Sequence, residues 1–461
     1  MRLNYFLFTL GVISLLYVIA VSNAGCAQIG SPTGGPKDTL PPRLVSASPK
    51  LNSTNVRANK ITLTFNEYID LKETQTNVLI SPLPQRTPAI DYKLRTVTVK
   101  FKDSLLPNTT YSINFGNAIV DNNEGNPLKD FTYVFSTGDT VDSLTLTGKV
   151  LIAETGNSDS TLFAMLYRNT DDSVVQKRKP DYIARLTGDG SFTFNNLSAG
   201  KYKVYALKDG DGGRTYNSKK ELFAFADTAI TVSANTEPVI LYASAIEKEI
   251  TTPVIRPSAD KKLRYNLSPT YQFQDLLSPF ELNFNKPLKR FDPAKLVLTD
   301  TNYKPIPSTS WTIDSSRTKV ILTNKWQQDV QYRLILDSTA ISDSSNKSIA
   351  KTDTIRFTTR REEDYGAVVL RFSNIDLAKH PVLQFIQGEE VKESYPLTGK
   401  EWSKKLISPG EYEIRILFDA NNNGKWDHGD YSKKLQPEKA ITLTQKLPVK
   451  ANWDNERDIK L

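Results

Sequence analysis

The chain has 461 residues, among them 20 Tyr and 20 Phe but only 2 Met, and a formal net charge of +8. Its one cysteine, Cys26, excludes an internal disulfide, and the two histidines, His380 and His428, lie too far apart in sequence to indicate a Cys/His zinc cluster. The basic residues are scattered and accompany no basic helix or aromatic–basic motif, so we expect no nucleic-acid partner.

The N-terminus has the order of a secretory signal. Arg2 precedes an apolar run over residues 5–21, and the small residues Ser22, Ala24 and Gly25 follow it. We therefore predict a signal peptide over residues 1–25. The apolar run is barely long enough to span a bilayer, so a retained anchor helix stays open as the alternative.

Cys26, directly after Ala24-Gly25, resembles the lipobox of bacterial lipoproteins. The resemblance implies cleavage before Cys26 and acylation of its thiol, which would make the membrane a partner through a lipid anchor. Asn23 departs from the aliphatic residue usual at its position. Ala27 is not the Asp associated with inner-membrane retention, so by analogy we expect the outer membrane, with the face undecided. Residues 26–42 contain several Gly and Pro and predict a flexible tether.

Two kinds of strand-rich segment then follow, and each occurs twice. Strict alternation of apolar and polar residues, as in KITLTF and TVTVKF, predicts strands with one buried face over residues 43–139. The same order of strand patterns recurs over residues 258–360. A second pattern, LSAGKYKVYALKD, lies within residues 144–245, and its counterpart ISPGEYEIRILFD lies within residues 365–461. We predict an all-β chain of tandem antiparallel β-sandwiches.

These motifs resemble known families. The strand ITLTFNEYID and the ending TYSINF…DNNEGNPL…FST are similar to the bacterial Ig-like domain of the SbsA type. The F-x-F-x-x-L-x-x-G-x-Y pattern resembles the transthyretin-like, carboxypeptidase-regulatory type of β-sandwich. The whole arrangement, with CA…PTGGPKDTLPP before the first segment, is similar to Ig-like lipoproteins of Bacteroidota. The resemblance implies scaffolds, spacers or binding modules and brings no catalytic residues.

One loop, DANNNGKWDHGD, has the composition of a calcium site. Hard oxygen ligands recur at alternate positions, Gly424 stands where the loop turns, and one backbone carbonyl would contribute. The candidate ligands are Asp419, Asn421, Asn423, Lys425, Asp427 and Asp430. A hairpin loop closed by Asn423-Gly424 and Asx turns is the alternative. The corresponding loop from Asp209 carries Arg214 and Lys220, which argues against a metal there.

The sequence thus favours a non-enzymatic cell-envelope lipoprotein that serves as a structural, adhesive or accessory binding scaffold, with an envelope protein or glycan as its partner. The alternative is a carbohydrate-binding lipoprotein of a glycan-uptake or surface-polysaccharide system, for which the five tryptophans could form a platform. A hydrolase has no motif to support it. Apart from structural Ca²⁺, we expect no cofactor.

Overall fold

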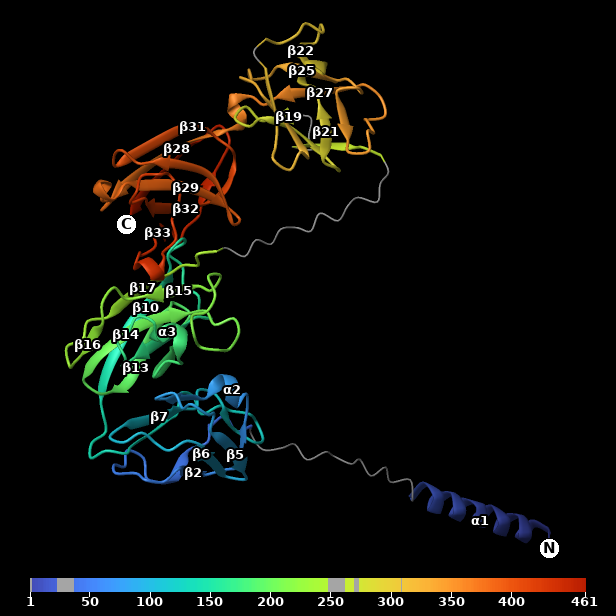
Figure 1. The fold of residues 1–461 in the computed structure, drawn as a ribbon. Coiled ribbons are helices and arrows are strands. Elements are labelled where there is room, and N and C mark those ends of the chain that lie inside the picture. Colours follow the sequence, from blue (N-terminus) through green and yellow to red (C-terminus); the bar gives the residue numbers. More distant parts are fainter. Residues whose placement is uncertain (1, 23–36, 248–261, 269–272, 308) are drawn as a thin grey trace. The chain divides into compact units, whose positions relative to one another are not determined.

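The computed structural model describes residues 2–22, 37–247, 262–268, 273–307 and 309–461 (Figure 1). Cys26 and most of the predicted tether lie outside these residues. The helices are α1 (Arg2–Ser22), α2 (Thr74–Asn77) and α3 (Val174–Lys177), with short 3₁₀ turns η1 (Pro293–Lys295), η2 (Glu362–Asp364), η3 (Leu377–Lys379) and η4 (Tyr431–Lys433). Within the described ranges, no helix has both the length and the apolar character needed to cross a membrane. The rest of the regular structure is strand, which confirms the predicted all-β fold of tandem β-sandwiches.

The strands fall into four sequential groups, which we call modules 1 to 4. Module 1 contains β1 (Leu44–Ser48), β2 (Lys60–Phe65), β3 (Ile69–Leu71), β4 (Leu79–Ser81), β5 (Ala89–Lys93), β6 (Thr96–Lys100), β7 (Thr110–Asn114), β8 (Ile119–Asp121) and β9 (Thr132–Ser136). Its sheets have the orders β1-β2-β6-β5, β4-β7-β9 and β3-β8. Val97 and Val99 of β6 are fully buried, as the alternation in TVTVKF predicts.

Module 3 repeats this topology. It contains β18 (Tyr265–Ser268), β19 (Phe273–Gln274), β20 (Phe280–Phe284), β21 (Leu288–Phe291), β22 (Leu296–Thr299), β23 (Ser310–Ile313), β24 (Lys319–Thr323), β25 (Gln331–Leu336), β26 (Ile341–Asp343) and β27 (Asp353–Thr359). The order β18-β20-β24-β23 corresponds to β1-β2-β6-β5, and the pair β21-β26 corresponds to β3-β8. The internal repeat in the sequence is therefore a repeat of strand order.

Module 2 contains β10 (Leu144–Ile152), β11 (Phe163–Tyr167), β12 (Tyr182–Arg185), β13 (Ser191–Leu197), β14 (Gly200–Leu207), β15 (Phe223–Phe225), β16 (Ile230–Val232) and β17 (Val239–Ala243). Its sheets are β13-β10-β17 and β12-β11-β14-β15, with β16 also on β14. The last strand, β17, runs parallel to β10, while the other pairs are antiparallel. The core lies between the two sheets and includes Phe192 and Phe194 from β13 and Tyr202 from β14.

Module 4 has the topology of module 2. It contains β28 (Gly366–Ser373), β29 (Pro381–Gln387), β30 (Glu390–Pro396), β31 (Glu401–Ile407), β32 (Gly410–Phe418), β33 (Lys439–Thr442), β34 (Leu447–Val449) and β35 (Asp454–Lys460). The sheets are β31-β28-β35 and β30-β29-β32-β33, with β34 also on β32. Leu370, Phe385 and Ile414 lie in its core.

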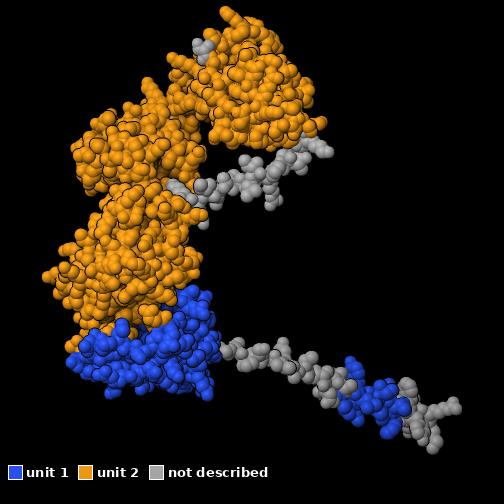
Figure 2. All heavy atoms as spheres, in the orientation of Figure 1, with its two compact units in different colours: residues 1–80, 86–108, 112–139 blue, residues 81–85, 109–111, 140–461 orange. Residues whose placement is uncertain are grey.

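The chain separates into two compact units (Figure 2). Unit 1 comprises Met1–Ile80, Arg86–Asn108 and Ser112–Asp139, and unit 2 comprises Ser81–Gln85, Thr109–Tyr111 and Thr140–Leu461.

Within unit 2, modules 2 and 4 contact each other although module 3 separates them in sequence. Tyr431 of η4 packs edge-on against Tyr205, Phe223 and Phe225 of module 2, with ring centroids 5.0–5.7 Å apart. Its hydroxyl donates to the carbonyl of Asp172 at 2.7 Å and lies 2.8 Å from the Tyr205 hydroxyl. Burial raises the pKa of Tyr431 well above its ordinary value, with further contributions from Tyr205. A largely buried, hydrogen-bonded aromatic side chain of this kind anchors an interface.

A second contact joins β33 to the turn after β10. The amide of Ala440 donates to the carbonyl of Ala153 at 2.9 Å, and the Thr442 hydroxyl donates to the carbonyl of Thr155. Gly156 lies in this turn with φ +72°, and a Cβ there would lie 2.6 Å from the carbonyl oxygen of Ala440. The close approach of the two backbones therefore requires glycine at this position.

Candidate functional site

The Asp419 loop connects β32 to β33 of module 4. Asp419 directly follows β32 and is fully buried, although a carboxylate is costly to bury unless its oxygens are paired. Its Oδ1 accepts from the amide of Asn423 at 3.1 Å, and its Oδ2 accepts from the amide of Gly424 at 2.6 Å. Gly424 has φ +77°, which lets the loop turn back toward Asp419. The Asp419 carboxylate therefore stabilises the turn of the loop through two backbone amides.

The alternate positions of the loop do come together. The side-chain amides of Asn421 and Asn423 both donate to Asp427 Oδ2, at 2.6 and 2.7 Å. The oxygen of Asn421 accepts from the Asn423 amide at 3.1 Å, and that of Asn423 accepts from the Lys425 amide at 2.7 Å. These two contacts are Asx turns, so the loop also has the hydrogen bonds of the hairpin alternative.

A carboxylate that the sequence did not nominate binds the loop backbone at two points. Glu438 Oε1 accepts from the Ala420 amide at 2.7 Å, and Oε2 accepts from the Asp427 amide at 3.1 Å. Burial raises the pKa of Glu438, and the charges of Asp419 and Asp427 raise it further. A carboxylate whose ionisation is disfavoured by burial and by neighbouring negative charges is one that a bound cation would stabilise.

Asp430, the predicted last ligand, makes its contacts elsewhere. It caps η4, where its Oδ1 accepts from the Ser432 amide at 3.0 Å, and its Oδ2 lies 3.2 Å from Lys433 Nζ. The Ser432 hydroxyl also donates to Oδ1, at 2.6 Å, and this bond is the main cause of the lowered pKa of Asp430. The structure thus brings Asp419, Asn421, Asn423 and Asp427 together, whereas Asp430 caps the 3₁₀ turn η4 that contacts module 2.

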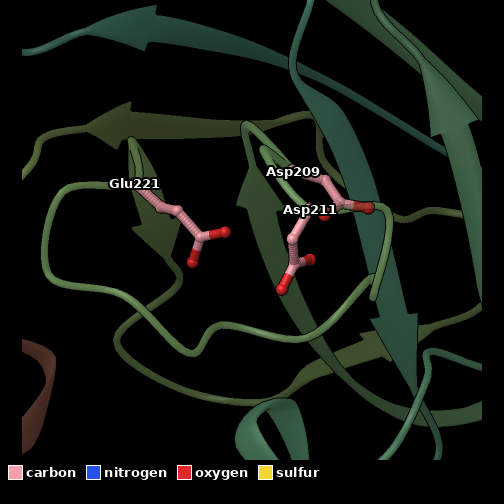
Figure 3. A group of neighbouring side chains, drawn as sticks. All are labelled: Asp209, Asp211 and Glu221. Atoms are coloured by element: carbon pink, nitrogen blue, oxygen red, sulfur yellow. The ribbon is translucent and has the colours of Figure 1, made fainter.

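The corresponding loop of module 2 contains an acidic triad. Single carboxylate oxygens of Asp209, Asp211 and Glu221 lie within 4.8 Å of one another (Figure 3). This group could hold a metal ion, in contrast to the sequence argument from Arg214 and Lys220. Asn217 Nδ2 donates to Asp211 Oδ2 at 2.7 Å and is the main cause of the lowered pKa of Asp211.

The strand register shows that the two loops are equivalent. Leu207 pairs with Phe223 in module 2, and Leu417 pairs with Ala440 in module 4. Asp209 lies two residues after Leu207, as Asp419 lies two after Leu417. Glu221 lies two residues before Phe223, as Glu438 lies two before Ala440. Sequence spacing missed both glutamates because the return strand, not the loop, positions them. The signal available was the recurrence of an acid just before each return strand.

The five tryptophans do not form a platform. Trp326 is buried and donates to the carbonyl of Ser278, and Trp426 donates to the carbonyl of Glu438. Trp402 packs against Tyr395 and Phe385, and Trp311 packs on the core of module 3. Trp453 is 63% exposed and lies beneath Lys450 Nζ. The geometry therefore does not favour the sugar-binding alternative.

Comparisons with known proteins support the fold. Residues 38–137 match the family described as bacterial Ig-like domain. No curated protein matches.

Several solved structures are similar. An alpha-2-macroglobulin from Escherichia coli is 13% identical with a TM-score of 0.20, and the match covers 41% of this chain and 74% of that one. The N-terminal part of the S-layer protein SbsC is 16% identical with a TM-score of 0.16, and the match covers 45% of each chain. The Bacillus anthracis TIE protein is 10% identical with a TM-score of 0.17, covering 93% of this chain and 75% of that one. The chain is a multidomain protein of tandem β-sandwiches that carries a bacterial Ig-like domain over residues 38–137.

Proposed function

We propose that the chain is a lipid-anchored, non-enzymatic scaffold of the bacterial cell envelope, of the SbsA-type and transthyretin-like lipoprotein kind indicated by its sequence. The observation that carries the proposal is the position of the sole cysteine. The apolar helix α1 ends at Ser22, just before Cys26, and the sandwiches begin soon after. Acyl chains on one thiol give a lasting hold on an outer membrane when two or more are attached.

The docking of modules 2 and 4 supports the scaffold role. Tyr431, Gly156 and the Ala440–Ala153 hydrogen bond join modules that are distant in sequence. An interface of buried aromatic and backbone contacts limits relative motion more than a linker does. Such a pair presents binding surfaces at a fixed spacing, which suits a structural, adhesive or accessory subunit whose partner is an envelope protein or glycan.

Metabolic labelling with a fatty acid tests the anchor. The chain has a single cysteine, so thioether-linked lipid can attach at one place only. The wild-type chain is expected to incorporate label and to have the mass of the chain without residues 1–25 plus lipid. Cys26→Ser should abolish the label and leave the uncleaved precursor. An unlabelled wild-type chain of full precursor mass would refute the proposal.

We also infer a structural Ca²⁺ in module 4. Asp419, Asn421, Asn423, Asp427 and the carbonyl of Lys425 would supply oxygens, and Glu438 would replace Asp430 as the closing carboxylate. Buried carboxylates and amide oxygens are the ligands that calcium prefers. The ion would fix the loop that leads into η4, so its role would be to stabilise the docking of modules 2 and 4.

A further inference from the structure

A pocket of about 710 Å³ on module 3 is lined mainly by cations and hydroxyl groups, together with Phe291 and Asn346, and none of its lining residues is a carboxylate. Lys289, Arg290 and Arg317 supply the charge, and Ser342 and Ser348 supply hydroxyl groups. The hydroxyl of Thr339, at the edge of the pocket, is engaged, because it donates to Asp337 Oδ1 and accepts from Lys295 Nζ, both at 2.7 Å. Surface cations usually have acids among their neighbours, so a pocket wall without any is a local concentration of positive charge.

None of the three cations is closely paired in the part of the chain that the structure describes. Arg290 Nη2 lies 3.8 Å from Asp292 Oδ2, and the other oxygen of Asp292 caps η1 by accepting from Ala294. Lys289 Nζ makes only a long contact, 3.4 Å, with Asn346 Oδ1. Within the described ranges, neither Lys289 nor Arg317 forms a salt bridge with an acidic residue. The charge of the pocket is therefore available to a ligand.

Arg317 is held in a fixed orientation. It has φ +57°, and its Nε and Nη2 donate to the carbonyls of Leu288 and Lys289, the latter at 3.1 Å. These bonds fix the plane of the guanidinium at the pocket wall without neutralising its charge. A preorganised guanidinium loses less side-chain entropy when it binds an oxyanion.

Module 1 contains the same pair of strands without the cations. The register of β21 and β26 shifts between Leu288 and Arg290, so Lys289 is an extra, bulged residue, whereas β3 and β8 pair without interruption. The pairing of Arg290 with Ser342 corresponds to that of Asp70 with Val120. The bond from the Leu288 amide to the Arg317 carbonyl corresponds to that from Ile69 to Leu94. Bulges of this kind redirect side chains, often beside functional sites.

We propose that this pocket of module 3 binds phosphoryl groups. Two guanidinium groups and one ammonium match the charge of a phosphate monoester or diphosphate, and guanidinium forks and hydroxyls match its oxygens. The pocket is far larger than one phosphate, so a phosphorylated sugar or a lipid headgroup would fit. The inference goes beyond the lipid anchor proposed above and does not depend on it.

Calorimetric titration of the purified full chain in a nonionic detergent at low salt tests the site. Inorganic pyrophosphate is the general probe. Glucose 1-phosphate represents a phosphorylated glycan, and glycerol phosphate represents a lipid headgroup. The variant K289Q/R290Q removes two charges that make no bond to the backbone, and we expect it to weaken pyrophosphate binding about tenfold or more. R317L introduces the residue that module 1 has and should weaken binding similarly.

The matched control is K60Q/K100Q, which also removes two charges. Lys60 and Lys100 are exposed and pair across β2 and β6 of module 1. Its affinity for pyrophosphate should stay within about twofold of the wild type.

Tighter binding of glucose 1-phosphate than of glycerol phosphate would assign the ligand to a glycan, and the reverse to a lipid. The proposal is overturned if the wild type binds no probe, or if K289Q/R290Q and K60Q/K100Q bind equally well. Thermal melting of each variant distinguishes lost binding from lost folding, and loss of the anchor through Cys26→Ser should leave binding unchanged.

Discussion

Individual side chains determine what the Asp419 loop can do. Asp419 is fully buried, and each of its oxygens accepts one backbone amide, so the folded loop tolerates the charge without an ion. Carboxylate oxygens have further lone pairs that can still bind a cation. Glu438 has a raised pKa, which means that part of the acidic cluster would gain from a positive charge nearby.

Calcium should therefore raise the melting temperature of the full chain. Binding at about 100 times the dissociation constant would add about 2.7 kcal/mol to the free energy of unfolding. Asp419→Ala and Glu438→Gln should each abolish the increment between millimolar calcium and chelator in thermal unfolding. Asp430→Ser keeps a residue that can cap η4 and should leave the increment intact. Equal melting of the wild type in calcium and in chelator would end the proposal, and loss of the increment in Asp430→Ser would restore Asp430 as the ligand.

The site was predictable only as far as it is local in sequence. Asp419, Asn421, Asn423 and Asp427 recur at alternate positions, and that periodicity indicates a loop with converging oxygens. Glu221 and Glu438 reach the two loops through the pairing of β14 with β15 and of β32 with β33. Strand pairing between distant residues has no signature in a short sequence window. The spacing therefore nominated Asp430 in module 4, and in module 2 it placed Lys220 at the corresponding position, which argued against a metal there.

At the scale of elements, the alternation of apolar and polar residues predicted the strands, but the sequence did not predict the contact between modules 2 and 4. The period-two pattern located β2, β6 and β20, whose apolar residues are buried as expected. Nothing in YSKKLQPEK marked η4 as an interface, because a single Tyr431 gives no sign in the sequence that its ring packs against Tyr205, Phe223 and Phe225. An interface depends on the shape and chemistry of both surfaces, so the sequence of one segment does not reveal that it packs against another.

Removing the Tyr431 ring should destabilise the contacting segments of both modules, β15 in module 2 and η4 in module 4. Tyr431→Ala deletes a largely buried aromatic side chain, a change that costs about 3 kcal/mol or more in a packed site. Tyr431→Phe keeps the ring and removes the hydrogen bonds to Asp172 and Tyr205, at a cost of about 1 kcal/mol. Hydrogen exchange should accelerate in peptides that contain β15 and η4, strongly for Ala and weakly for Phe. Unchanged exchange in β15 with Tyr431→Ala would show that the ring does not hold the modules together.

At the scale of the whole molecule, the internal repeat in the sequence predicts four sandwiches. It does not reveal that modules 2 and 4 contact each other. Modules 2 and 4 share a strand order and each has a hydrophobic core of its own, which is the property of a unit that can fold alone. For modules 2 and 4 to contact each other, the chain has to leave module 2, form module 3 and return. Energetic coupling between the two modules is therefore a property of the assembled unit 2 and can be measured as cooperativity in unfolding.

Gly156 gives a clean test of that coupling, because module 2 contains a matched control. Gly156 and Gly212 have φ +72° and +78°, so Ala costs about 1 kcal/mol in backbone strain at either position. A Cβ at Gly156 would lie 2.6 Å from Ala440 O of module 4, whereas a Cβ at Gly212 would meet nothing within 4 Å. In differential scanning calorimetry, modules 2 and 4 of the wild type should unfold in one transition, and Gly156→Ala should split it in two. Gly212→Ala should lower the temperature of the single transition without splitting it, because the strain weakens module 2 while the contact with module 4 remains. A single transition for Gly156→Ala, like that of Gly212→Ala, would mean that the close approach at Gly156 does not couple the modules. Two transitions already in the wild type would mean that the docked modules unfold independently.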